Sequence, residues 1–286
     1  MSPSVKNTYY RAKLLMKFPS AIPRLLLRGT GAATEHIDKM VASEYLRSPL
    51  PLVRRRGVWI YLRPDDGFVS PYIQVVGAYD IDAILLLERI LRKEDTVLDI
   101  GANIGWHALI CAKKAGKIYA FEPEPTNFSL LSKSVERNGF HNVKLFNCCV
   151  WNRDGDVNLM LSDENPGHNS IVWKVGAKSI SVPCVTLNAL ALKEGLERID
   201  LMVLDVEGAE PMVLSGASRL IDEGRITHII MEYSPAVWVE NPKLLSQIFR
   251  HYNVFEMRKD FKRLSLESLP PYHANLYLKM NSESER

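Results

Sequence analysis

The sequence contains no apolar stretch of the roughly 20 residues that a membrane-spanning helix needs. The longest candidate, from Ile81 to Leu91, is interrupted by two acids and an arginine. The apolar pieces near the amino terminus are short and separated by prolines, so no secretory signal peptide is expected. These absences predict a soluble, cytoplasmic protein.

The sequence also has few cysteines and a small net charge. The four cysteines show no paired spacing of the kind that metal sites use, so buried thiols in a reducing compartment are expected. With 36 Lys and Arg against 33 Asp and Glu, the net charge of +3 is too small to indicate a polyanionic partner. No nucleic acid is therefore expected to bind.

Acidic residues are missing altogether from residues 1–34, which carry six Lys and Arg among several leucines. Such a segment can rest on an anionic membrane surface, or it can form short helices that pack on the rest of the chain. Pro19 and Pro23 prevent one long amphipathic helix, so packing is favoured. Peripheral membrane contact through this basic segment is the alternative.

From Thr96 onward, apolar strands and helices alternate regularly. Several strands are apolar throughout, which is typical of a parallel sheet covered by helices on both faces. The last two strands have no clear helix between them, so an antiparallel final strand is expected. The predicted fold is α/β, a doubly wound, mostly parallel seven-stranded sheet, with strands at Thr96–Ile100, Lys117–Phe121, Val143–Cys149, Leu201–Val206, Thr227–Glu232, Val254–Met257 and Asn275–Met280.

Residues 1–76 are predicted to form an N-terminal helical and β-hairpin extension. A strand at Gly57–Arg63, a turn at residues 64–67 and a second strand-like piece after it indicate the hairpin. The main domain then covers residues 77–286 and begins with a helix at Asp80–Arg92.

The first strand of the main domain ends in a glycine-rich turn, Asp99 to Gly105 (DIGANIG). Glycines at such a turn let the backbone approach a ligand closely. A dinucleotide fingerprint would need glycine where this chain has Asn103 and Trp106. A carboxylate at Asp99 would also face a pyrophosphate badly, so both observations argue against a dinucleotide.

Asp99 suits a ligand that carries positive charge and no phosphate. S-adenosyl-L-methionine is such a ligand, because it has an ammonium and a sulfonium group. Glu122 ends the next strand, where an acidic side chain can accept both hydroxyls of a ribose. The sequence therefore predicts S-adenosyl-L-methionine as cofactor.

Further motifs lie on both sides of the glycine turn, and with them the chain resembles the FkbM-type methyltransferase family over roughly residues 60–280. They are Gly77–Asp80 (GAYD), Phe121–Pro123 (FEP), Pro183–Leu187 (PCVTL), Asp205–Glu210 (DVEGAE) and Met231–Pro235 (MEYSP). The resemblance implies a class I methyltransferase (Rossmann-like) fold. It also implies methyl transfer to a hydroxyl of a small molecule or glycan: a sugar, a glycolipid or a secondary metabolite.

The motifs and the resemblance together give the expected cofactor-binding residues: Asp80, Asp99, Gly101, Asn103, Gly105, Glu122, Pro123, Cys148, Cys149 and Asp205. Three positions depart from the family pattern, which usually has Lys at Val203, Asp at Asn188 and Glu at Asp80. The first two changes each remove a charge. The resemblance therefore predicts the acceptor-binding chemistry less directly than the cofactor site.

Catalytic acids are expected at the carboxyl ends of the fourth and fifth strands, at Asp205, Glu207 and Glu232. Glu207 can alternatively cap the following helix, and Glu210 is expected to be a solvated or dipole-pairing acid. His168 is a further candidate base in a flexible loop, with a solvated loop histidine as the alternative. No histidine or further acid is spaced to complete a cation site, so no metal is expected.

Two other functions stay open at this point. One is an NAD-dependent α/β enzyme, against which Asn103 and Trp106 argue. The other is a catalytically silent methyltransferase fold used as a binding protein, which the lost charges at Val203 and Asn188 keep open. Pro270 and Pro271, before the last strand, are predicted to lie in a loop.

Overall fold

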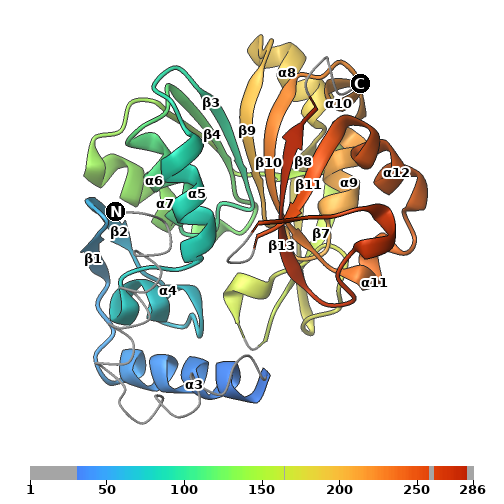
Figure 1. Cartoon of the computed structure of the whole chain (residues 1–286). Coiled ribbons are helices and arrows are strands. Elements are labelled where there is room, and N and C mark those ends of the chain that lie inside the picture. The colour runs from blue at the N-terminus through green and yellow to red at the C-terminus, as the bar shows by residue number, and fades with distance from the viewer. Residues whose placement is uncertain (1–30, 164, 258–260, 282–286) are drawn as a thin grey trace.

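An eight-stranded sheet with strand order β12-β11-β13-β10-β9-β3-β4-β5 forms the centre of the fold (Figure 1). The computed structural model describes residues 31–163, 165–257 and 261–281. The strands of this sheet are β3 (Thr96–Ile100), β4 (Lys117–Phe121), β5 (Val143–Phe146), β9 (Ile199–Leu204), β10 (Ile226–Tyr233), β11 (Tyr252–Glu256), β12 (Lys262–Arg263) and β13 (Ala274–Met280).

Strands β5, β4, β3, β9 and β10 are parallel, and β13 runs antiparallel between β10 and β11. The predicted mostly parallel sheet is confirmed, and the two-residue strand β12 adds an eighth member at its edge. The predicted strand Val143–Cys149 is divided, because β6 (Cys149–Val150) leaves the sheet. It pairs instead in a small unpredicted sheet with β7 (Gly155–Leu161) and β8 (Lys178–Val185).

Helices cover both faces of the large sheet (Figure 1). Successive strand residues alternate between the two faces: Val97 packs into one core and Leu98 into the other. One face carries α5 (Ile81–Ile90), α6 (Trp106–Ala112) and α7 (Pro125–Asn138), and the other α8 (Leu187–Glu194), α9 (Glu210–Gly216), α10 (Ser218–Asp222) and α12 (Pro242–His251). The short helix α11 (Pro235–Trp238) follows β10.

The N-terminal part of the described chain comprises α3 (Gly31–Arg47), a hairpin of β1 (Leu52–Arg55) with β2 (Val58–Tyr61), α4 (Val69–Pro71) and the π-helix η2 (Tyr72–Val76). A hairpin is present, but the predicted pairing of residues 57–63 with the piece after residue 67 is wrong. Residues 58–61 pair instead with β1, which precedes them, and the piece after residue 67 is helical. The reason is local: the Asp66 carboxylate accepts hydrogen bonds from the backbone amides of residues 68–70 and starts a helix.

These N-terminal elements share one apolar core with α5 and α6, so the domain boundary after residue 76 stays a prediction. Residues 1–30, on which the membrane-contact alternative depends, lie outside the described residues. Within the described part of the chain, none of the helices combines the length and apolarity that a bilayer crossing needs.

Candidate active site

Two adjoining cavities lie at the carboxyl ends of β3, β4, β9 and β10, where ligands bind in a doubly wound sheet. Their volumes are about 640 and 1140 Å³. Five residues line both cavities and therefore mark the junction between them: Gly101, Asn103, Gly167, Asp205 and Glu207.

The smaller cavity combines apolar walls with one buried acid. Its walls include Phe121, Val150 and Ile171, and the acid is Glu122, which is only 5% exposed. The two carboxylate oxygens of Glu122 accept hydrogen bonds from the backbone amides of Asn103 and Glu124, each at 2.8 Å. Burial raises the pKa of Glu122 to about 7, although these two hydrogen bonds lower it. The glycine turn is thus tied to the end of β4.

An ion pair forms the floor of the larger cavity. His107 Nε2 lies 3.3 Å from Asp80 Oδ2, and both residues line the cavity. Burial lowers the pKa of His107, but the adjoining Asp80 carboxylate outweighs this effect and raises the pKa to about 9. At neutral pH His107 is therefore an imidazolium, and Asp80, at a φ of +43°, is its counter-ion.

Asp99 lies buried behind the glycine turn, with 1% of its surface exposed. Its Oδ2 atom has no hydrogen-bond partner within the described part of the chain. Burial raises the pKa of Asp99 to about 6, while the charge of His107 opposes this shift. Asp99 thus adds a buried carboxyl with one unpartnered oxygen next to Ile100, which lines the smaller cavity.

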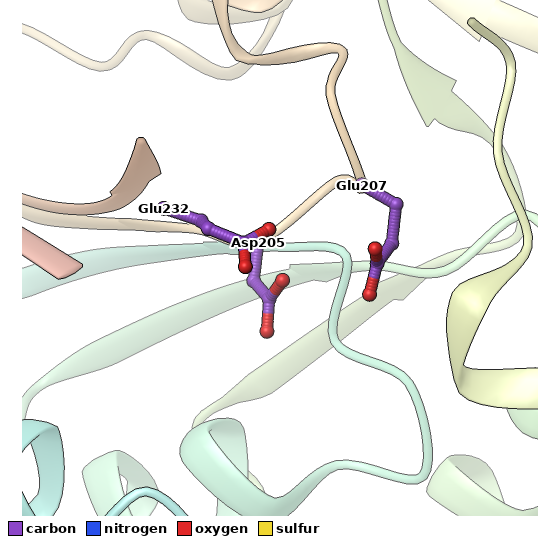
Figure 2. Close-up of side chains that lie close together, drawn as sticks. All are labelled: Asp205, Glu207 and Glu232. Atoms are coloured by element: carbon purple, nitrogen blue, oxygen red, sulfur yellow. The ribbon is translucent and has the colours of Figure 1, made fainter. Parts of the chain in front are cut away.

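Asp205, Glu207 and Glu232 come together in an acidic cluster (Figure 2), as the sequence predicted. Each offers a carboxylate oxygen, and these oxygens lie within 4.8 Å of one another. Burial raises the pKa of all three side chains; mutual repulsion adds to the shift at Asp205 and Glu207, and the charge of Asp80 adds to it at Glu232. Such a cluster can bind a cation, and it can accept hydrogen bonds from hydroxyl groups or, where a carboxyl is protonated, donate one to them.

The turn that carries this cluster is held by Glu210. Its Oε1 atom accepts hydrogen bonds from the backbone amides of Val206 at 3.3 Å and Gly208 at 3.2 Å. Glu210 is 1% exposed, so the expectation of a solvated acid is wrong, whereas its place in the first turn of α9 agrees with the dipole-pairing alternative. The capping alternative for Glu207 is also wrong, because the N-cap residue of α9 is Ala209, no side chain caps the helix, and Glu207 lines both cavities.

Most of the expected cofactor residues reach the cavities, and some do not. Asp99, Gly105 and Cys148 are absent from the lining of both cavities, although all three adjoin residues of the lining. Gly105 starts α6 at a φ of +98°. The expected residues that do line a cavity are Asp80, Gly101, Asn103, Glu122, Pro123, Cys149 and Asp205.

Val203 and Asn188, which stand where the family usually has a charged residue, lie in different parts of the fold. Val203 is buried in the sheet and lines the larger cavity. Asn188 lies on α8 and accepts a hydrogen bond from the backbone amide of Leu220 on α10, away from both cavities. The change at Asn188 is therefore structural, and only Val203 bears on the site.

Several lining residues were missed by the sequence analysis. Phe68 and Val69 reach the larger cavity from the N-terminal elements, and Tyr79 reaches it from the segment between η2 and α5. His273, just before β13, and Asn275, within it, reach the cavity from the other side of the sequence. The antiparallel direction of β13 was the available signal, because it brings the amino end of that strand to the edge where the parallel strands end. The predicted candidate His168 lines the same cavity.

Comparison with known proteins gives a family. Residues 99–259 match the methyltransferase FkbM domain. Hexuronic acid methyltransferase AglP of Haloferax volcanii is 26% identical over 186 residues, which cover 64% of this chain and 74% of AglP. The 2-O-methyltransferase NoeI of Sinorhizobium fredii is 26% identical over 195 residues, covering 61% of this chain and 78% of NoeI. The crystal structure of methyltransferase FkbM from Methylobacillus flagellatus is 13% identical, with a TM-score of 0.44 over 86% of this chain and 60% of that one.

Proposed function

This chain belongs to the FkbM methyltransferase family and is an S-adenosylmethionine-dependent methyltransferase, and we propose that it methylates a hydroxyl oxygen of a sugar or sugar-containing acceptor. The observation that carries the proposal is the acidic cluster of Asp205, Glu207 and Glu232 in the larger cavity. The family match sets the NAD-dependent alternative aside.

The residues present fit the cofactor. Glu122 in the smaller cavity would bind the ribose hydroxyls, and the apolar walls beside it suit an adenine ring. Asp205 and Glu207, at the junction of the cavities, would face the positive charge of the ligand. The cofactor supplies an electrophilic methyl group on a cationic sulfur. The excess of carboxylates over the single imidazolium of His107 matches a cationic ligand better than a phosphate.

The acidic cluster also favours a neutral acceptor over an anionic one. A hydroxyl group donates hydrogen bonds to carboxylates, whereas an acceptor carboxylate placed in the same cavity would meet like charges in a poorly solvated site. Methyl transfer to a hydroxyl further depends on holding the oxygen in line with the methyl group and on removing its proton. Glu232, which lines only the larger cavity, would hold the acceptor hydroxyl.

The names of the relatives agree with a sugar acceptor, because AglP is described as acting on a hexuronic acid and NoeI as a 2-O-methyltransferase. A hexuronic acid carries hydroxyls and a carboxyl, so the two possible products are a methyl ether and a methyl ester. Only the ether requires that a proton leave the acceptor oxygen.

A matched pair of acceptors tests the proposal. A methyl glucuronide and the corresponding methyl glucoside differ only in the group at C6, and each is incubated with enzyme and methyl-labelled cofactor. We expect both sugars to be labelled, and the glucoside at least as strongly as the glucuronide. The label should be stable to mild base, because the methyl group is bound as an ether. Label confined to the glucuronide and released as methanol by mild base would identify an ester and refute the proposal.

A further inference from the structure

His273 lies at the acceptor side of the larger cavity, on the same face of the sheet as Glu232. In the pairing of β10 with β13, Glu232 is opposite Asn275 and Tyr233 is opposite Ala274. Successive side chains of an extended chain point to opposite faces. The side chains of residues 273 and 275, two positions apart, therefore point to the same face. His273, Asn275 and Glu232 all line the larger cavity and none of them lines the smaller one.

We propose that His273 accepts the proton of the acceptor hydroxyl, an inference that rests on the proposed transfer to oxygen. The acceptor oxygen gains the methyl carbon while the carbon–sulfur bond breaks, and its electron pair stays on sulfur. The proton of the hydroxyl passes to His273, which then releases it to water. Histidine is the most frequent general base in such steps.

Solvent contact distinguishes His273 from the carboxylates. His273 is exposed, whereas Asp205, Glu207 and Glu232 are half-buried within the cluster. Asp205 and Glu207 also line both cavities, where the cofactor would cover them. A base must lose its proton to water in every turnover, and only a group at the open side of the cavity does so directly.

Hydrogen bonding distinguishes His273 from His168. In His168, Nε2 lies 3.3 Å from Nδ2 of Asn165, and an amide nitrogen can only donate, so the lone pair of that ring nitrogen is engaged. In His273, Nε2 lies 3.4 Å from Oγ of Ser234, which accepts as readily as it donates. When His273 donates to Ser234, its Nδ1 carries a free lone pair.

Ser234 therefore acts as a positioning residue. It is 4% exposed, it directly follows β10, and its hydroxyl holds the His273 ring against the end of that strand. The titratable groups that share the larger cavity with His273 are Tyr79, Asp80, His107, His168, Asp205, Glu207 and Glu232.

The test uses the full chain with an acceptor that it labels and compares single substitutions. His273→Ala is expected to lower kcat by roughly 10²- to 10³-fold, with little change in cofactor affinity or melting temperature. Added imidazole should restore part of the rate, because it enters the space left by the ring. His273→Gln, which keeps much of the volume, should be as slow but not rescued. Ser234→Ala should lower kcat about tenfold with KM nearly unchanged, and Ser234→Thr should restore it.

Two further variants provide the comparison. His141→Ala alters an exposed histidine outside both cavities and should leave the rate unchanged. A large, imidazole-rescued loss in His168→Ala, with His273→Ala near the wild-type rate, would overturn the proposal while the transfer to oxygen stands. A base-labile ester as product, with His273→Ala fully active, would overturn both, because an acceptor carboxylate has no proton to lose.

Discussion

A Cβ atom on Gly101 would lie 1.8 Å from the backbone oxygen of Asp205. This close approach joins the glycine turn after β3 to the acidic turn after β9, and the backbone amide of Asp205 donates to the oxygen of Ile100 beside it, at 3.0 Å. Gly101 also has a φ of +83°, which side chains disfavour. Two sequence motifs separated by about a hundred residues thus form one wall of the site.

Gly101→Ala should therefore abolish cofactor binding and destabilise the fold. The added methyl group forces the two turns apart, and the positive φ alone costs about 1–2 kcal/mol in a residue with a side chain. Gly139→Ala is the matched control, since Gly139 has a φ of +65° but open space around its Cβ position. We expect the control to lower stability by about 1 kcal/mol and to bind S-adenosylhomocysteine normally in calorimetric titration. Equal binding by both variants would contradict this account of the wall.

Glu122→Gln should weaken cofactor binding by roughly 10- to 100-fold, the effect of one or two charge-assisted hydrogen bonds. The substitution keeps the shape, but the amide nitrogen that replaces one carboxylate oxygen cannot accept, so the backbone amide of either Asn103 or Glu124 loses its acceptor. Glu124→Gln is the control: Glu124 is also buried, but it pairs with Arg63 and lines neither cavity. It should lower the melting temperature and leave the affinity for S-adenosylhomocysteine within about twofold, since the Glu124 side chain itself reaches neither cavity. If Glu124→Gln lost as much affinity for S-adenosylhomocysteine as Glu122→Gln, Glu122 would have no specific role in cofactor binding.

How far the site could be predicted depended on strand direction. The carboxyl ends of the parallel strands led to Asp205, Glu207 and Glu232, which do meet in one cluster. The same rule missed His273, because it precedes an antiparallel strand whose amino end reaches that edge. Glu210 was misjudged for another reason: its position in the first turn of a helix indicates a solvated acid, and only the fold shows the two amides that it accepts from. The helical stretch after residue 68 was hidden in a β-rich composition and depends on the hydrogen bonds that the Asp66 carboxylate accepts from the backbone amides of residues 68–70.

The stability of the ligand-free protein should fall as the pH rises from about 4 to about 8. Unfolded carboxyls lose their protons near pH 4, whereas burial holds the pKa of Glu122 at about 7 and that of Glu210 at about 8 in the fold. In this window the folded state binds more protons than the unfolded state, so raising the pH favours unfolding. His107, with its pKa raised to about 9, adds a loss of the same sign above about pH 6.5.

The cationic cofactor should oppose this loss. Its positive charge favours the ionised forms of Asp205 and Glu207, so the increase in melting temperature on binding should be larger at pH 8 than at pH 5.5. S-adenosylhomocysteine, with a neutral sulfur, serves as the comparison and should show a smaller dependence on pH. Identical pH dependence for the two ligands would place the acidic cluster away from the sulfur.

Chelation should leave the activity intact. The three carboxylates lie close enough to hold a divalent cation, but a dication there would repel the cationic sulfur that the same groups attract. Enzyme treated with EDTA and then freed of it is expected to keep its full rate of methyl transfer. Loss of activity that Mg²⁺ or Mn²⁺ restores would show instead that the cluster is a metal site.

The central claim is that the acidic cluster serves methyl transfer to a hydroxyl. The most direct measurement is to incubate the enzyme with methyl-labelled cofactor and fractionated cell extract, and to treat the labelled fraction with mild base. The account predicts that the label enters a carbohydrate-containing fraction and resists base. Mass spectrometry should then locate the methyl group on a hydroxyl oxygen of a sugar. Label that base releases as methanol, or label that enters no acceptor while the cofactor binds normally, would contradict it.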